Sequence, residues 1–260
     1  MKHHTVLGHA HRLCITLTFL LLVLGAWELA SHRPHAPDYF LGPVEILQEA
    51  ARSLLHGEVI VPAAHSLYRA YAGFLVGGLV GLAMGLLSGV SRPLRELFDV
   101  PQAFVHAIPK ISPFPAVAVW LGFTDASRIL IIALSCFFPA YLNAMSGALS
   151  INPRYLWLSR NNEATSFATF VQIVLPASLP RAMVGLRISL MVAFILMVAT
   201  EVIGHSNGLG TMVMNAYQNG EYRQMYAAIL LIAVAGFVSN LGMERLSTRL
   251  CRGQNLATGG

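Results

Sequence analysis

The chain has 260 residues, of which 55% are hydrophobic and only 11% are charged, and its formal net charge is +5. A soluble domain usually carries about a quarter charged residues, so this chain has too little polar surface to cover itself in water. The composition excludes an ordinary soluble domain and favours a protein built from membrane-spanning helices.

Six apolar segments approach the roughly 20 residues that a helix needs to cross a hydrocarbon core about 30 Å thick. They predict an all-α polytopic membrane protein with six transmembrane helices over residues 13–250. A short N-terminal tail, 1–12, precedes this domain, and a disordered tail, 251–260, follows it. The predicted spans are Leu13–Ala30, Leu67–Ser88, Phe104–Phe123, Ile129–Leu149, Met183–Val202 and Met225–Leu241.

The basic residues favour one orientation of these spans. With a cytoplasmic N-terminus, ten Lys and Arg residues fall in inner segments and four in outer segments. Positive-inside insertion then places both termini in the cytoplasm. The basic charge therefore reflects topology, and no nucleic-acid partner is needed to explain it. An alternative is that Lys2, Arg12 and the first apolar run form a cleaved signal peptide, which would leave five spans.

The outer segment after the first span contains a short periodic stretch. Gly42 and Pro43 are followed by apolar residues at helical spacing up to Leu55. This pattern predicts an amphipathic helix that lies on the membrane surface or against the next span.

The second span carries five glycines, each four residues after the last. In a helix this spacing makes one smooth groove, which lets another helix approach closely. The groove is expected to pack inside a single chain, and a seam between two copies is the alternative. The glycines are Gly73, Gly77, Gly81, Gly85 and Gly89.

The third span is interrupted by Pro109, Pro113 and Pro115, and it also holds Lys110. Irregular backbone at membrane depth is tolerated only where it is buried in protein or lines a water-filled cavity. A charge at this depth usually faces such a cavity or a partner. Pro109, Lys110 and Pro113 are therefore candidates for a pathway lining. The alternative is a kinked helix whose Lys110 reaches an interface.

Glu201 ends the fifth span and completes this set of pathway candidates. An acid at a span end is often interfacial. As a functional group it could pair with Lys110 or Arg128, or hold a chain of water molecules.

The polar segment between the fourth and fifth spans, residues 152–181, ends in Ile173-Val174-Leu175-Pro176. Glu163 lies ten residues before Ile173, and Trp157-Leu158-Ser159 begins six residues before Glu163. This frame resembles the cytoplasmic coupling loop of ABC importer permeases. That family has a Glu-Ala-Ala triplet and a Gly at the corresponding positions.

Other segments in the same order strengthen the resemblance to permeases of the nitrate/sulfonate/taurine type. It implies a type I ABC importer fold in a bacterial inner membrane. It also implies an importer of a small solute, an organic or inorganic anion such as a sulfonate or nitrate. The partners would be a second permease copy, two copies of an ABC ATPase and an extracytoplasmic substrate-binding protein. The segments are Gly25–Ala30, Ser66–Arg69 with Gly73-Phe74, Ala107–Ile111 with Pro115 and Trp120–Gly122, Phe138-Pro139, Leu175–Pro180 with Gly185–Arg187, and Glu201 with Gly208–Gly210.

The coupling frame departs from the family at two places. Trp157 and Leu158 replace an acid and a small residue, so a hydrophobic contact to the ATPase would replace a salt bridge. Glu163 replaces a Gly that would serve a turn between two short helices, and a left-handed Glu is strained. Because Asn enters that region more readily, the turn is expected to move upstream onto Asn161-Asn162. The loop could also be a plain cytoplasmic connection, or one that has lost its coupling.

The motifs that the chain lacks narrow its function. It has no Gly-x4-Gly-Lys-Ser/Thr phosphate loop, no His-Glu-x-x-His and no Gly-x-Ser-x-Gly. Cys14, Cys136 and Cys251 show no metal-site spacing, so no metal, cofactor or catalytic residue is predicted. The rival classes are a stand-alone secondary transporter or channel and a membrane enzyme, and a neighbouring ATPase gene would separate the first of these from an importer.

Overall fold

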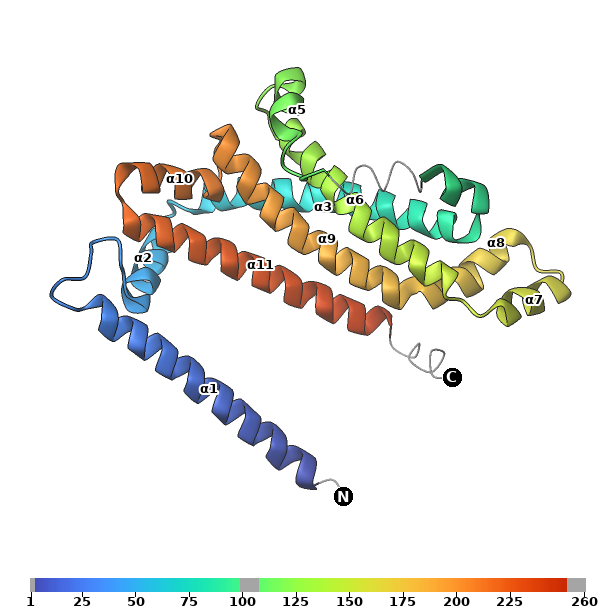
Figure 1. The fold of residues 1–260 in the computed structure, drawn as a ribbon, viewed down its shortest axis with the longest axis horizontal. Helices are drawn as coiled ribbons and strands as arrows, with labels where there is room; N and C mark the ends of the chain where they lie inside the picture. Colours follow the sequence, from blue (N-terminus) through green and yellow to red (C-terminus); the bar gives the residue numbers. More distant parts are fainter. Residues whose placement is uncertain (1–2, 99–107, 252–260) are drawn as a thin grey trace. The chain divides into compact units, whose positions relative to one another are not determined.

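The computed structural model describes residues 3–98 and 108–251, and the elements identified in these ranges are all helical (Figure 1). The helices are α1 (His3–Ser31), α2 (Pro43–Leu55), α3 (Ile60–Val90), α5 (Phe114–Leu121), α6 (Asp125–Leu149), α7 (Pro153–Asn161), α8 (Ser166–Thr169), the π-helical turn η1 (Phe170–Val174), α9 (Leu175–Gly204), α10 (Leu209–Asn219) and α11 (Tyr222–Leu250).

Five helical segments in the described ranges are long and apolar enough to cross a membrane. Each corresponds to a predicted span, namely the first, second, fourth, fifth and sixth. The prediction of an all-α polytopic membrane protein is confirmed. The segments are Cys14–Ser31, Ile60–Val90, Asp125–Leu149, Ser166–Gly204 and Tyr222–Leu250.

The predicted third span, Phe104–Phe123, is not one continuous helix in its described part. Residues 104–107 lie outside the described residues. Ile108–Pro113 is non-helical, and the eight-residue helix α5 follows. Proline explains the break, because each ring removes an amide donor and clashes with the preceding turn.

The structure describes most of the predicted N-terminal tail and little of the predicted C-terminal one. Helix α1 already begins at His3, so most of the predicted tail 1–12 is helical. At the other side, α11 ends at Leu250, and the predicted disordered tail lies outside the described residues from position 252 onward.

The chain divides into two compact units, and the first comprises residues 1–60 and 212–231. In this unit, α2 is the expected amphipathic helix and buries Ile46, Ala50 and Ser53. The end of α1 is bound to the start of α2, because the backbone N–H of Val44 donates to Glu28 Oε2 at 3.1 Å. A carboxylate at a helix N-terminus complements the helix dipole, so this contact stabilises the turn between α1 and α2.

The second unit comprises residues 61–211 and 232–260, and its centre is formed where α3, α6 and α9 pack together. The glycine stripe of α3 faces α6. A Cβ added to Gly77 or Gly81 would overlap backbone atoms of Ala133 or Phe137. The stripe therefore packs within the chain, which lets the two helix backbones approach closely.

Helices α6 and α9 are joined by a reciprocal pair of polar contacts in the core. Ser189 Oγ donates to the Cys136 carbonyl at 2.7 Å, and Cys136 Sγ donates to the Ser189 carbonyl at 3.2 Å. Water is absent from a hydrocarbon core, so polar groups there need partners inside the protein. This pair satisfies both side chains and fixes the register of α6 against α9.

The glycine contact gives a stability prediction. In Gly77→Ala the new methyl group meets the backbone of Ala133, which cannot rotate away. Overpacking usually costs about 1–3 kcal/mol of stability, so the variant should unfold at a lower temperature. The measurement is size-exclusion chromatography of the detergent-solubilised protein after heating, which gives the temperature at which half of the monodisperse peak is lost. Gly242→Ala is the matched control, since nothing lies within 4 Å of its Cβ position. Equal behaviour of the two variants would contradict this packing.

Candidate functional site

The loop between α6 and α9 folds as two short helices, α7 and α8, each with a side-chain cap. Asn152 Oδ1 accepts from the Arg154 backbone N–H at 3.0 Å, and Thr165 Oγ1 accepts from the Ala168 N–H at 3.2 Å. The two helices are tied by a 2.6 Å hydrogen bond between Ser159 Oγ and Thr169 Oγ1. Ser159, the last residue of the triplet frame, is therefore buried between them.

The turn between α7 and α8 is made by Glu163, at a φ of 54°. The expectation that the turn moves onto Asn161-Asn162 is wrong, because Asn161 is the last residue of α7 and neither Asn has positive φ. Glu163 thus adopts the left-handed conformation at the position where the family has Gly, despite a cost of about 1–2 kcal/mol. The turn therefore falls at the position where the frame has Gly, although the residue here is Glu163.

Apolar side chains protrude from this loop. Trp157 is 65% exposed, Leu158 is 59% exposed and Phe167 on α8 is 78% exposed. Large exposed apolar side chains on a polar connection are typical of a surface that meets another protein. The loop also connects directly to the membrane, because Ile173 lies in η1 and α9 begins with Leu175-Pro176. Helix α8 is therefore continuous with the spanning helix α9 through η1.

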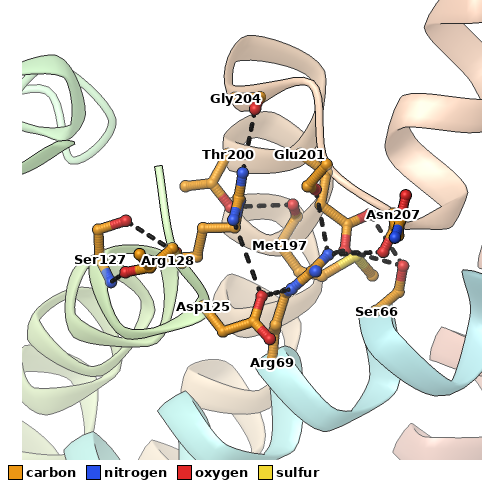
Figure 2. A network of polar contacts seen from close by, with 12 residues as sticks. Ser66, Arg69, Asp125, Ser127, Arg128, Met197, Thr200, Glu201, Gly204 and Asn207 are labelled. Atoms are coloured by element: carbon orange, nitrogen blue, oxygen red, sulfur yellow. Dashed lines mark hydrogen bonds and ion pairs between the residues drawn. The ribbon is translucent and has the colours of Figure 1, made fainter. Parts of the chain in front are cut away.

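A network of charged side chains, all buried except Asp125, joins α3, α6 and α9 near the ends of these helices (Figure 2). Arg69 of α3 is only 3% exposed. Its Nε donates to Asp125 Oδ1 and its Nη1 donates to Glu201 Oε1, each at a distance of 2.7 Å. The same Nη1 also lies within hydrogen-bond distance of Ser206 Oγ and the Asn207 carbonyl, at 3.1 and 3.0 Å. One guanidinium therefore fastens the starts of α3 and α6 to the end of α9.

Glu201 is fully buried, and every donor around it comes from this second unit. Besides Arg69, its carboxylate accepts from Ser66 Oγ at 2.8 and 2.9 Å and from the Gly210 N–H at 2.9 Å. The anion thus lies at the N-terminus of α10, where the helix dipole favours negative charge. Gly208 is needed for this approach, because a Cβ there would overlap the Glu201 carboxylate.

Arg128 forms the other end of the network. Its Nη1 donates to the Phe123 carbonyl and its Nη2 to the Gly204 carbonyl, each at 3.0 Å, while Asp125 lies 3.8 Å away. Gly204 is the last residue of α9, so Arg128 places a positive charge at the negative end of that helix. Arg69 and Arg128 therefore fix the end of α9 from two sides.

This network was only partly foreseen. Glu201 was expected to be interfacial or to pair with Lys110 or Arg128, but its partner is Arg69. Ser66 and Asp125 also belong to the network, and neither was predicted to bond to Glu201 or Arg69. The one signal that could have revealed the pair is that Arg69 and Glu201 both lie near the outer ends of predicted spans, where they can meet at one membrane depth.

The other pathway candidates, Pro109, Lys110 and Pro113, form no hydrogen bond or ion pair with this network among the described residues. Pro109 and Pro113 belong to the non-helical segment before α5, and Lys110 between them is half-buried. No hydrogen bond or ion pair links Lys110 to Glu201 among the described residues. The four predicted pathway residues are thus divided between an irregular segment and a closed ion network.

Comparison with known proteins agrees with these features. The profile of the family described as "binding-protein-dependent transport system inner membrane component" matches residues 73–252. An aliphatic sulfonates transport permease protein of Bacillus subtilis is 32% identical over 82% of this chain and 77% of its own length. The taurine transport system permease protein of Escherichia coli is 28% identical over 90% of this chain and 86% of its own. The nitrate import permease protein of Leptolyngbya laminosa is 22% identical over the same shares, 90% and 86%.

Solved structures share the fold. A bacterial ABC transporter involved in the import of alginate aligns with a TM-score of 0.60 over 95% of this chain and 96% of its own, at 17% identity. The MetNI methionine ABC transporter aligns with a TM-score of 0.53 over 81% and 98%, also at 17% identity. The chain belongs to the family of binding-protein-dependent transport system inner membrane components, and it is a membrane-spanning transport subunit with the type I ABC importer permease fold.

The buried network predicts a large stability difference between two conservative substitutions. Glu201→Gln leaves the guanidinium of Arg69 buried with one carboxylate fewer. Removing one partner of a buried ion pair costs about 3–5 kcal/mol, so the unfolding temperature should fall clearly. Unfolding can be followed by reaction of the buried Cys136 thiol with a fluorogenic maleimide, in a Cys14→Ser/Cys251→Ser background.

Glu244→Gln is the control for this measurement. It breaks the ion pair between Arg187 and Glu244, whose side chains are 40% and 50% exposed. Exposed pairs contribute about 0–1 kcal/mol, so this variant should unfold close to the parent protein. If the two variants shift by the same amount, the buried network does not hold the helix ends together.

Proposed function

We propose that the chain is the permease subunit of an ATP-driven importer, working as a homodimer with two copies of a separate ABC ATPase and an extracytoplasmic binding protein. ATP hydrolysis belongs to the partner. The chain lies in a bacterial inner membrane with both termini in the cytoplasm, as the bias of its basic residues supports. The observation that carries the proposal is the α7–α8 loop, with exposed apolar residues at its surface and a direct connection to α9.

In this proposal the loop transmits the closure of the ATPase to the membrane. Trp157 and Leu158 enter a groove on the ATPase and form a hydrophobic anchor. The hydrogen bond between Ser159 and Thr169 makes α7 and α8 move together. Because η1 runs into α9 without a break, a displacement of α8 also displaces α9 and the helices fastened to it. The buried arginine network makes the far ends of α3, α6 and α9 respond as one body.

The solute that the chain carries is proposed to be a small anion. The relatives are named for aliphatic sulfonates, taurine and nitrate, and the shared chemistry of these solutes is a compact oxyanion group. A binding protein would deliver such a solute from outside.

A charged cleft in the first unit supports a docking surface for the binding protein. It has a volume of about 710 Å³ and lies between the segment after α1, α2 and the turn before α11. With both termini in the cytoplasm, this cleft faces outward. Paired charges of both signs, such as Glu45 and Arg223 at 3.9 Å, give a surface that can orient a partner by electrostatic complementarity. Charged residues that line it are Asp38, Glu45, Glu49, Arg52, Glu221 and Arg223.

The loop is tested by substituting its two exposed residues together. Trp157→Ala/Leu158→Ala should reduce the amount of ATPase that co-purifies with the chain from its native membrane at least tenfold, since truncating interface anchors costs roughly 2 kcal/mol or more each. Trp120→Ala is the control, because Trp120 is 81% exposed but lies on α5. Undiminished ATPase recovery with the double variant would contradict the anchoring role.

The cleft is tested by reversing one charge. Glu221→Lys should reduce the stimulation of ATPase activity by the binding protein several-fold, and the defect should shrink as ionic strength rises, because salt screens the charges. Glu58→Lys makes the same change of charge at an exposed outer residue that does not line the cleft. An equal loss in both variants would mean that only net charge matters and that the cleft is not the docking surface.

A further inference from the structure

The segment from Ile108 to Pro113 has an irregular backbone that is fixed in place by short turns. The Ser112 N–H donates to the Pro109 carbonyl at 2.9 Å, and the Phe114 N–H donates to the Ile111 carbonyl at 3.0 Å. Ile111 packs against the core that Ile132, Cys136 and neighbouring residues form. The segment is thus held against the spanning helices and does not hang from them as a loose loop.

Lys110 directly precedes Ile111, and the core cluster against which Ile111 packs includes Cys136. Cys136 lies near the midpoint of α6, which runs from Asp125 to Leu149. The midpoint of a ~30 Å hydrocarbon core is about 15 Å from either interface, which is too far for the four-carbon stem of a lysine to cross. Snorkelling to an interface therefore does not account for this charge.

Lys110 differs from three arginines of the same unit in its partners. Arg69 bonds to two carboxylates, Arg128 to two backbone carbonyls, and Arg187 to Asn240 and Glu244. For Lys110 there is no hydrogen bond or ion pair to any residue in the ranges 3–98 and 108–251. Its side chain is half-buried. A cation inside the membrane that has no partner among the described residues is costly, and such a charge normally faces a water-filled path or an anion.

We propose that Lys110 is the residue with which the transport pathway binds the oxyanion group of the solute as it passes the middle of the membrane. The proposal rests on the proposed function, and it assigns the substrate class to one side chain. A single ammonium group suits this step, because a transported ion must be bound firmly enough to enter and weakly enough to leave. A lysine acts as a compact charge, whereas an arginine would form a bidentate clamp on the oxyanion.

The first test measures charge selectivity at this position without knowledge of the solute. Ser112, an exposed neighbour of Lys110, is replaced by Cys in a variant that lacks Cys14, Cys136 and Cys251. The complete transport complex in proteoliposomes is then treated with methanethiosulfonate reagents that carry either a sulfonate or a trimethylammonium group. A unit charge about 6–7 Å away changes the ratio of the two rates roughly five- to tenfold, so Lys110→Met should lower the anion-to-cation ratio by that factor.

Two results of this measurement would overturn the proposal. If the introduced thiol reacts with neither reagent while the complex still hydrolyses ATP, position 112 faces no aqueous path. If it reacts with both and the ratio is unchanged by Lys110→Met, the ammonium group does not select anions. Either result holds whichever solute the importer carries.

The second test follows ATP-dependent uptake of ethanesulfonate, taurine and nitrate by the same complex. Lys110→Met should lower the uptake rate of the transported anion at least tenfold, and Lys110→Arg should retain part of it. If the parent protein takes up none of them with ATP, the proposed function fails for these solutes, and the thiol assay alone decides the role of Lys110. If the parent protein transports and Lys110→Met transports equally well, the inference fails while the proposed function stands.

Discussion

The buried ion pair between Arg69 and Glu201 holds together the helix ends of the second unit. Both side chains are buried from solvent, so each of these charges is tolerable only while the other is in place. The pair lies where the start of α3 meets the end of α9, and Asp125 extends it to the start of α6. Glu201 also receives the N-terminus of α10. One cluster thereby fixes four helix ends.

Close packing and polar bonding make different contributions to the assembly of α3, α6 and α9. The glycine stripe of α3 brings its backbone against α6 over most of its length, which gives the unit many small contacts but little directional control. The directional contacts include the arginine network, the Ser189–Cys136 pair and the hydrogen bonds from Arg181 Nη1 to Ser146. At the other end of α9, the loop with α7 and α8 is tied by its own hydrogen bond and exposes apolar residues. This arrangement suits a body that is moved at one end and responds at the other.

The sequence predicted what depends on local pattern. The lengths of the apolar segments predicted the five spanning helices found among the described residues. The four-residue spacing of glycines predicted the groove on α3, and the prolines predicted the irregular segment before α5. What it missed depends on the register between distant helices. Arg69 and Glu201 are 132 residues apart, and no periodicity states that they meet. The turn at Glu163 was misjudged for a different reason: the caps at Asn152 and Thr165 and the bond between α7 and α8 hold the loop geometry strongly enough to impose a left-handed conformation on a residue that disfavours it.

The central claim is that this chain moves its solute only when a separate ATPase drives it. The most direct measurement is solute accumulation in proteoliposomes that contain the chain with its ATPase, with the binding protein outside and ATP or a non-hydrolysable analogue inside. The account predicts accumulation against a gradient with ATP and none with the analogue or without the binding protein. Accumulation that needs only an ion gradient, or leakage of solute through the chain alone, would contradict it and would identify a stand-alone transporter or channel.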